Sequence, residues 1–174
     1  RRGCSCRSAG ARGLAGVAFH VVEAVDRANE VQKSILVPRI EAHLGGLAGR
    51  TVAIWGLAFK PRTDDMREAP AIEIAAHLVE AGAKVRGYDP VAMDVARPVL
   101  PSVEMFKDPY EMARGCDGVM VVTEWNEFKQ LDFYKLKASM KSPALIDARN
   151  VYEPDKMVLA GFNYRGVGRG YNHK

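Results

Sequence analysis

The stretch TVAIWGLAFKPRTDDMREAP, residues 51–70, decides the fold of this 174-residue chain. It opens with an apolar run between Gly49 and Lys60, which predicts a strand over residues 51–58. A charged loop follows, and Pro70 then begins a helix, where its missing N–H costs nothing. Because α/β sheets bind ligands at the carboxyl ends of their strands, this stretch predicts a site as well as a fold.

The rest of the chain continues the alternation of strands and helices. Further strands are expected over residues 84–88, 103–106, 118–123, 144–147 and 162–167. Helices are expected over residues 70–81 and 94–99, after Asp108, after Asp132 and in the tail from residue 156. This alternation predicts an α/β fold with a Rossmann-like, doubly wound, mostly parallel sheet and helices on both of its faces.

A long helix is expected before the first strand. Apolar residues recur at helical spacing over residues 21–44, with charged residues between them. Pro38 lies inside this pattern, so we expect a kink or break over residues 34–37. The segment 17–48 is either an ordinary amphipathic helix or a helix that connects two domains and forms a dimer interface. Residues 49–174 are expected to form the Rossmann-like domain.

Charge and hydropathy argue against two classes of partner. Four arginines within residues 1–16 account for the net charge of +4, so the other 21 basic residues balance the 21 acidic ones. We therefore expect no nucleic-acid partner. No apolar run approaches the roughly 20 residues that cross a bilayer, so we expect no membrane partner and a cytoplasmic location. Residues 1–16 have no acid and no hydrophobic period, which predicts a disordered or non-native segment.

The three cysteines do not indicate a metal site. Cys4 and Cys6 are separated by one residue and have no second pair, so no zinc site is expected. Cys116 lies just before an apolar strand and is expected to be a buried, inert thiol. This small, odd number of cysteines fits a reducing compartment.

Three side chains at predicted strand ends are candidates for ligand binding. Phe59 can carry the flat face of a base or sugar, and Lys60 beside it can neutralise a phosphate. The alternative is that Phe59 belongs to the core and Lys60 is a solvated charge. Arg149 has a planar fork that suits phosphate or ribose oxygens. Its alternative is a surface ion pair with Asp147 or Asp64.

The first strand lacks the usual dinucleotide fingerprint. That fingerprint is G-x-G-x-x-G, whereas Gly56 is followed by Leu-Ala-Phe-Lys. Asp89 ends the second predicted strand, where a Rossmann fold places its ribose-binding acid, and its alternative role is a turn with Pro90. A response-regulator-like domain also has an acid at a strand end, but the further acids and the lysine that should accompany it are not in place.

Four motifs occur together in this chain: GLAFKPRTDDMREAP, GAKVRGYDP, DPYEMARGCDGVMVVTEWNEF and LIDARNVYEP. In this order they resemble the C-terminal domain of the UDP-glucose 6-dehydrogenase family, over residues 20–170. TEWNEF resembles the UDP-glucose enzymes more than their GDP-mannose or N-acetylmannosamine relatives. The resemblance implies an oxidoreductase that converts UDP-glucose to UDP-glucuronate in two hydride transfers to NAD.

The same resemblance implies roles for five side chains. It places Phe59, Lys60 and Arg149 in contact with the UDP-sugar. Arg67 would reach NAD bound on another domain. Lys33, within ANEVQK, would reach the substrate of the neighbouring subunit in a homodimer formed through the long helix.

Two departures from the family pattern limit what the resemblance implies. We find neither the N-terminal NAD-binding domain nor the cysteine motif GGSCFPKD, of which GCSC is only a faint echo. No catalytic role is therefore assigned to Cys4 or Cys6. The chain is expected to bind a UDP-sugar without turning it over. The alternative is a stand-alone nucleotide-sugar-binding or regulatory module without enzyme activity.

Overall fold

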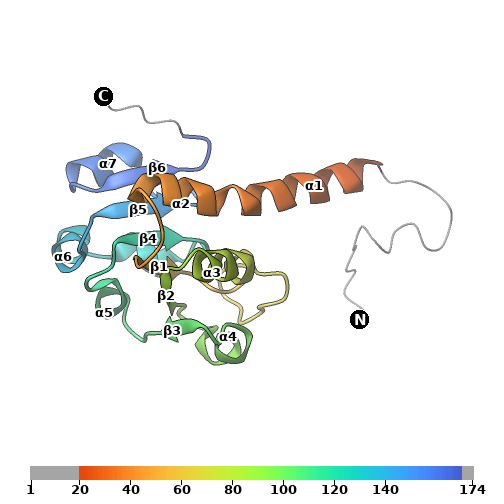
Figure 1. Cartoon of the computed structure of the whole chain (residues 1–174), viewed down its shortest axis with the longest axis horizontal. Coiled ribbons are helices and arrows are strands. Elements are labelled where there is room, and N and C mark those ends of the chain that lie inside the picture. Colours follow the sequence, from red (N-terminus) through yellow and green to blue (C-terminus); the bar gives the residue numbers. More distant parts are fainter. Residues whose placement is uncertain (1–19, 170–174) are drawn as a thin grey trace. The chain divides into compact units, whose positions relative to one another are not determined.

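The structure, a computed structural model, describes residues 20–169 (Figure 1). Its chain divides into two compact units, Arg1–Ile35 and Leu36–Lys174. The described part of the first unit consists of α1 (His20–Ser34) and Ile35, and all other elements belong to the second. The prediction for residues 1–16 lies outside the described residues.

The predicted break in the long helix is confirmed. Helix α1 ends at Ser34, and α2 (Leu36–Leu44) begins after Ile35. Pro38 is the third residue of α2, where a backbone N–H would have no partner within the helix. In a continuous helix, the Pro38 ring would clash with the carbonyl of Ser34, which explains the position of the break.

Six strands form a parallel sheet in the order β3-β2-β1-β4-β5-β6. The strands are β1 (Thr51–Trp55), β2 (Lys84–Tyr88), β3 (Val103–Met105), β4 (Gly118–Val121), β5 (Ala144–Asp147) and β6 (Asn163–Gly166). Strands β3 and β6 form its opposite edges (Figure 1). This arrangement confirms the α/β, Rossmann-like, doubly wound fold.

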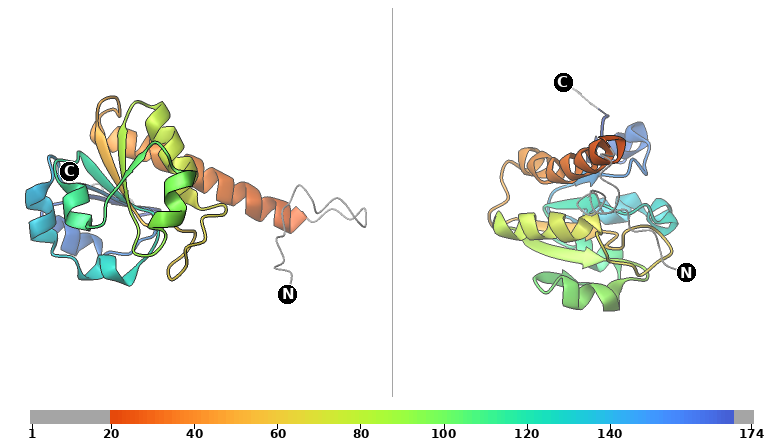
Figure 2. Two further views of the ribbon diagram at one scale, coloured as in Figure 1. Left: turned by 90° about the horizontal axis from the view of Figure 1, so that it is seen from below. Right: turned by 90° about the vertical axis from the view of Figure 1, so that its right-hand side faces the viewer.

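Helices cover both faces of this sheet (Figure 2). One face packs against α2, α3 (Pro70–Glu80) and α4 (Met93–Val99). The other packs against α5 (Pro109–Ala113), the 3₁₀ helix η1 (Asn126–Gln130), α6 (Phe133–Ser139) and α7 (Pro154–Leu159). No helix within residues 20–169 is long and apolar enough to cross a membrane.

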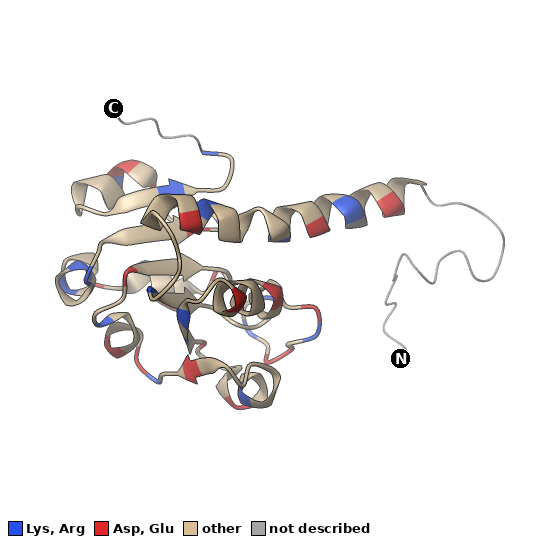
Figure 3. Cartoon of the chain, in the orientation of Figure 1, with Lys and Arg blue, Asp and Glu red and all other residues tan. Residues whose placement is uncertain are grey.

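Alternate residues of the central strands supply the two cores, as the two-residue period of a strand requires. Val52 and Ile54 of β1 point to the first face, whereas Ala53 and Trp55 point to the second. Cys116 is buried in the second core, as predicted, and this burial raises the pKa of its thiol to about 11. Acidic and basic residues are interspersed over residues 20–169 (Figure 3).

Two predicted helix starts are confirmed in detail. The Asp108 carboxylate accepts hydrogen bonds from the backbone N–H groups of residues 110 and 111 at the start of α5. Asp132 caps α6 in the same way. Each carboxylate satisfies N–H groups that the first turn of a helix leaves without partners.

The structure differs from the sequence-based prediction at the end of the first strand. We expected that strand to extend to residue 58, but β1 ends at Trp55. Gly56 has a φ of 85°, which turns the chain out of the sheet. The 3₁₀ helix η1 was not predicted.

Candidate functional site

The segments that follow the two central strands, β1 and β4, run in different directions at one end of the sheet. The chain leaves β1 toward α3 on the first face, and it leaves β4 toward α6 on the second face. Because β1 and β4 are neighbours, the loops that follow them flank the point where the winding of the sheet reverses. In open α/β sheets, ligands bind in the crevice at this point.

Gly56 lets these two loops come into contact. A Cβ atom at this position would lie 2.4 Å from the Thr123 Cβ and 2.7 Å from the Thr123 backbone nitrogen. Only a residue without a side chain fits this contact. The Thr123 hydroxyl donates a 2.7 Å hydrogen bond to the carbonyl of Ala58, which joins the loops two residues further on.

Asp89 fixes the same region from β2. Its side chain is almost completely buried, and one carboxylate oxygen accepts hydrogen bonds from the backbone N–H groups of Leu57 and Ala58, at 2.8 and 3.1 Å. The same oxygen accepts a 3.1 Å bond from the indole N–H of Trp125. The other oxygen accepts the backbone N–H groups of Val91 and Ala92.

The five donors to Asp89 change its interpretation. A ribose-binding acid needs a free oxygen, whereas protein donors from three loops surround this carboxylate. The turn interpretation is correct for the bonds to residues 91 and 92, but the sequence did not predict the bonds to the other two loops. Asp89 is therefore a positioning residue for the chain that leads to residues 59 and 60.

Phe59 and Lys60 lie directly after this fixed segment, and both are exposed. Phe59 is 52% exposed, so the alternative that places its ring in the core is wrong. Its backbone N–H donates a 2.9 Å hydrogen bond to the carbonyl of Asp65, which closes the charged loop. An exposed aromatic ring beside a lysine can contact the flat face and the phosphate of one ligand.

Arg149 forms a bidentate ion pair with Glu124, with nitrogen–oxygen distances of 2.6 and 2.9 Å. The pair joins the loop after β4 to the loop after β5. We expected an ion pair with Asp147 or Asp64 as the alternative to ligand binding, and both partners were wrong. Asp147 instead accepts a hydrogen bond from the backbone N–H of Arg149. The guanidinium hydrogen bonds lower the pKa of the Glu124 carboxyl.

Arg67 extends from the charged loop into solvent. Its side chain is 86% exposed, and its guanidinium forms two hydrogen bonds with the Asp65 carboxylate, at 2.7 and 2.9 Å. These bonds lower the pKa of Asp65 to about 2. Lys33 belongs to α1 in the first unit and forms a 2.8 Å ion pair with Glu30.

Three of the predicted site residues lie at the same end of the sheet, just after the carboxyl ends of strands. Phe59 and Lys60 follow β1, and Arg149 follows β5, with β4 and Glu124 between them. The convergence of these side chains on one cleft stays a prediction. Within residues 20–169, no group of three or more His, Cys, Asp or Glu side chains could hold a metal ion.

Four residues of this site were not predicted from the sequence: Gly56, Thr123, Glu124 and Trp125. Thr123, Glu124 and Trp125 lie in the loop that follows the fully buried strand β4, at the end of the sheet where ligands bind, and this position is a signal that could have indicated them. Gly56 occupies the position of the first glycine in the dinucleotide fingerprint G-x-G-x-x-G, and this is a similar signal.

Comparison with known proteins identifies the family of this chain. Residues 53–154 match the family model described as "UDP-glucose/GDP-mannose dehydrogenase family, UDP binding domain". The chain belongs to this family. The match includes most of the strand ends described above, so the site lies in the part of the family fold that is named for UDP binding.

Individual relatives agree with this assignment. The chain is 43% identical to UDP-glucose 6-dehydrogenase of Rhizobium meliloti over 150 residues, which cover 86% of this chain and 34% of that protein. It is 41% identical to the enzyme of the same name from Pseudomonas aeruginosa, over 88% of this chain and 36% of the relative. The chain therefore spans about a third of the length of the curated relatives it matches.

Solved structures of the family have the same fold. A UDP-glucose dehydrogenase from Pyrobaculum islandicum superimposes with a TM-score of 0.74 at 36% identity, covering 89% of this chain and 34% of that one. A UDP-D-ManNAc dehydrogenase from Pyrococcus horikoshii gives 0.73 at 26% identity, over 91% of this chain and 36% of that one.

Proposed function

We propose that this chain is the UDP-sugar-binding part of an NAD-dependent UDP-glucose 6-dehydrogenase, which oxidises UDP-glucose to UDP-glucuronate. One observation carries the proposal. The exposed pair Phe59 and Lys60 follows β1, and Arg149 follows β5, at the carboxyl end of the parallel strands. The domain that carries them matches the family's UDP-binding domain. The two curated relatives described above are named for this substrate.

In this proposal each site residue has a separate task. Phe59 packs its ring on a flat face of the ligand, and Lys60 neutralises phosphate charge. Arg149 donates hydrogen bonds from its planar guanidinium to phosphate or ribose oxygens. Its two hydrogen bonds with Glu124 must break before both donors can contact the ligand. Asp89 and Gly56 take no part in binding themselves, but they hold the backbone from which residues 59 and 60 extend.

In the complete enzyme, bound NAD would supply the hydride acceptor for this oxidation. Asp89 is fully used by protein donors, which argues against this domain as the main NAD-binding one. Arg67 is the residue that we propose to contact NAD, because its guanidinium is exposed and its ion pair with Asp65 leaves it open to solvent. Lys33 would reach the substrate of a neighbouring subunit in a homodimer. The 174-residue chain by itself would bind UDP-sugar without producing NADH.

Calorimetric titration with UDP, UDP-glucose and GDP-mannose tests the proposal. We expect both uridine ligands to bind, and GDP-mannose to bind more weakly. Lys60→Ala and Arg149→Gln should each weaken UDP binding by about tenfold or more, because each removes a charge-assisted contact. Lys84→Ala is the matched control, since this exposed lysine lies at the other end of the sheet. The proposal fails if GDP-mannose binds as tightly as UDP-glucose, or if Lys84→Ala has the same effect as Lys60→Ala.

Glu124→Gln gives a second test with the opposite sign. Glu124 accepts two hydrogen bonds from the Arg149 guanidinium, the group that would otherwise contact the ligand. Removing its charge should therefore tighten UDP binding by about threefold, within the range of about 0.2–1 kcal/mol that is typical of an exposed ion pair. Glu127→Gln, an exposed glutamate on η1, should leave the affinity unchanged. Weaker binding in Glu124→Gln would instead indicate that the ion pair itself supports the bound ligand.

A further inference from the structure

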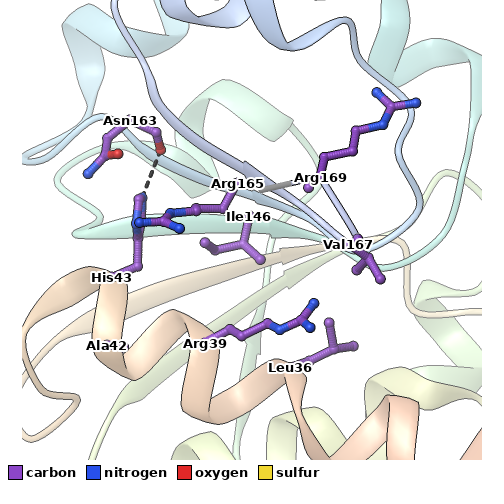
Figure 4. A pocket seen from close by; sticks show the side chains of 11 residues that line it. Leu36, Arg39, Ala42, His43, Ile146, Asn163, Arg165, Val167 and Arg169 are labelled. Carbon is purple, nitrogen blue, oxygen red and sulfur yellow. Dashed lines mark hydrogen bonds between the residues drawn. The ribbon is translucent and has the colours of Figure 1, made fainter. Parts of the chain in front are cut away.

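A second concave surface lies away from the carboxyl ends of the central strands. It is a groove of about 620 Å³ between α2 and the edge strand β6, including the turn that follows β6 (Figure 4). Its apolar floor includes Leu36 of α2 and Ile146 of β5, both of which are buried. Nothing in the proposed function uses this groove.

The charged side chains that line the groove are all basic. They are Arg39 on α2, Arg165 on β6 and Arg169 in the turn after β6, and no aspartate or glutamate of the described part of the chain lines the groove. Arg39 and Arg165 are exposed, and neither forms an ion pair with any residue in the described range 20–169. Arg169 uses one guanidinium nitrogen to donate a 3.0 Å bond to the carbonyl of Tyr152.

His43 contributes no charge to the groove at neutral pH. Burial lowers its pKa, and the nearby Arg165 lowers it further, although the hydrogen bond with Asn163 acts in the opposite direction. The ring donates its Nε2 hydrogen to the backbone carbonyl of Asn163 over 2.8 Å, as the dashed line in Figure 4 shows. The arginines are therefore the cations of this surface.

An unbalanced cluster of this kind favours an anion. Guanidinium groups that share a groove repel one another, and the attraction of each group to a bound anion would offset this repulsion. The arginine fork matches phosphate oxygens in a bidentate way. The apolar floor beneath the charged rim can contact the carbon part of a small organic ligand.

We propose that the groove between α2 and β6 is a second binding site, for a small phosphate-bearing anion of at least two negative charges. Arg39 and Arg165 would hold its oxygens from opposite walls. The site is independent of the proposed UDP-sugar site, which uses Lys60 and Arg149. The Asn150 side chain donates a hydrogen bond to the carbonyl of Val167, which joins the loop after β5 to the wall of the groove.

Amide NMR spectra of the full 174-residue chain can test this site. The backbone amides of Gly166 and Gly168, which line the groove, should shift in a saturable manner during titration with inorganic pyrophosphate. The double variant Arg39→Gln/Arg165→Gln should weaken this binding by about tenfold or more. Ala42→Glu adds a carboxylate to the wall of the groove without removing a native contact, and it should weaken binding as well.

Two controls separate this site from general charge effects and from the proposed UDP-sugar site. Arg97→Gln/Lys129→Gln removes two exposed charges elsewhere and should leave the Gly166 and Gly168 shifts unchanged. Arg149→Gln should also leave them unchanged. A parallel titration with ADP distinguishes the ligand source: tighter binding of ADP than of pyrophosphate indicates an organic diphosphate, and equal or weaker binding an inorganic one.

Three outcomes would overturn the proposal. The first is that millimolar pyrophosphate leaves the Gly166 and Gly168 amides in place. The second is unchanged affinity in both Arg39→Gln/Arg165→Gln and Ala42→Glu. The third is an equal loss of affinity in the Arg97→Gln/Lys129→Gln control.

Discussion

Replacing Gly56 with alanine should lower the free energy of unfolding by about 3 kcal/mol. Part of this loss comes from the φ of 85°, which an L side chain adopts only at a cost of about 1–2 kcal/mol. The rest comes from overlap, because the new Cβ would lie 2.4 Å from the Cβ of Thr123. Overpacking of this kind costs about 1–3 kcal/mol, since rigid backbone must move to relieve it. Urea denaturation of the purified variant measures the loss.

Gly115→Ala is the matched control for this prediction. Gly115 has a similar φ of 70°, but a Cβ built there meets no atom within 4 Å. It should therefore show only the conformational part of the cost, about 1–2 kcal/mol. Equal losses in the two variants would show that the contact between Gly56 and Thr123 is not tight in solution. Gly56→Ala should also weaken UDP binding more than Gly115→Ala does, because the overlap displaces the segment that carries Phe59 and Lys60.

Replacing Asp89 with asparagine should also cost about 3 kcal/mol or more of unfolding free energy. The two side chains have nearly the same volume, so no cavity forms. In asparagine, however, an NH₂ group replaces one of the two carboxylate oxygens. Depending on its orientation, this NH₂ faces either the two N–H donors that bond to one oxygen of Asp89 or the three that bond to the other. At least two buried donors then lose their partner, and each such loss costs about 1–3 kcal/mol.

Asp94→Asn provides the matched control, since this exposed aspartate in the first turn of α4 should change stability by no more than about 0.5 kcal/mol. Urea denaturation compares the two variants. The Trp125 indole N–H resonance should shift in Asp89→Asn, because this N–H loses either its acceptor or the negative charge of that acceptor. An unchanged indole resonance together with unchanged stability would contradict the role assigned to this carboxylate.

The sequence predicted those elements whose limits depend on local signals. Strands β2 and β5 have the predicted bounds, and Asp108 and Asp132 cap the helices expected after them. In each case a turn residue or a capping side chain lies within a few positions of the limit. Such signals are visible in a single sequence because no distant residue contributes to them.

The missed features depend on residues far apart in the chain. β1 ends early where the N–H groups of Leu57 and Ala58 bond to Asp89, which is 31 or 32 residues away. Arg149 pairs with Glu124 rather than with Asp147, the acid two residues before it. Only the strand order brings such partners together, and periodicity does not give the strand order. The sequence therefore predicted where the candidate site lies, but not the side chains that position it.

The shared carboxylate of Asp89 also determines how the site should open in solution. Five N–H groups from three loops depend on one side chain, so a fluctuation that removes this side chain releases them together. The amide hydrogens of Leu57, Ala58 and Ala92 should therefore exchange with solvent deuterium at similar rates, as one cooperative unit. Phe59 and Lys60 would then keep their places until that unit opens as a whole.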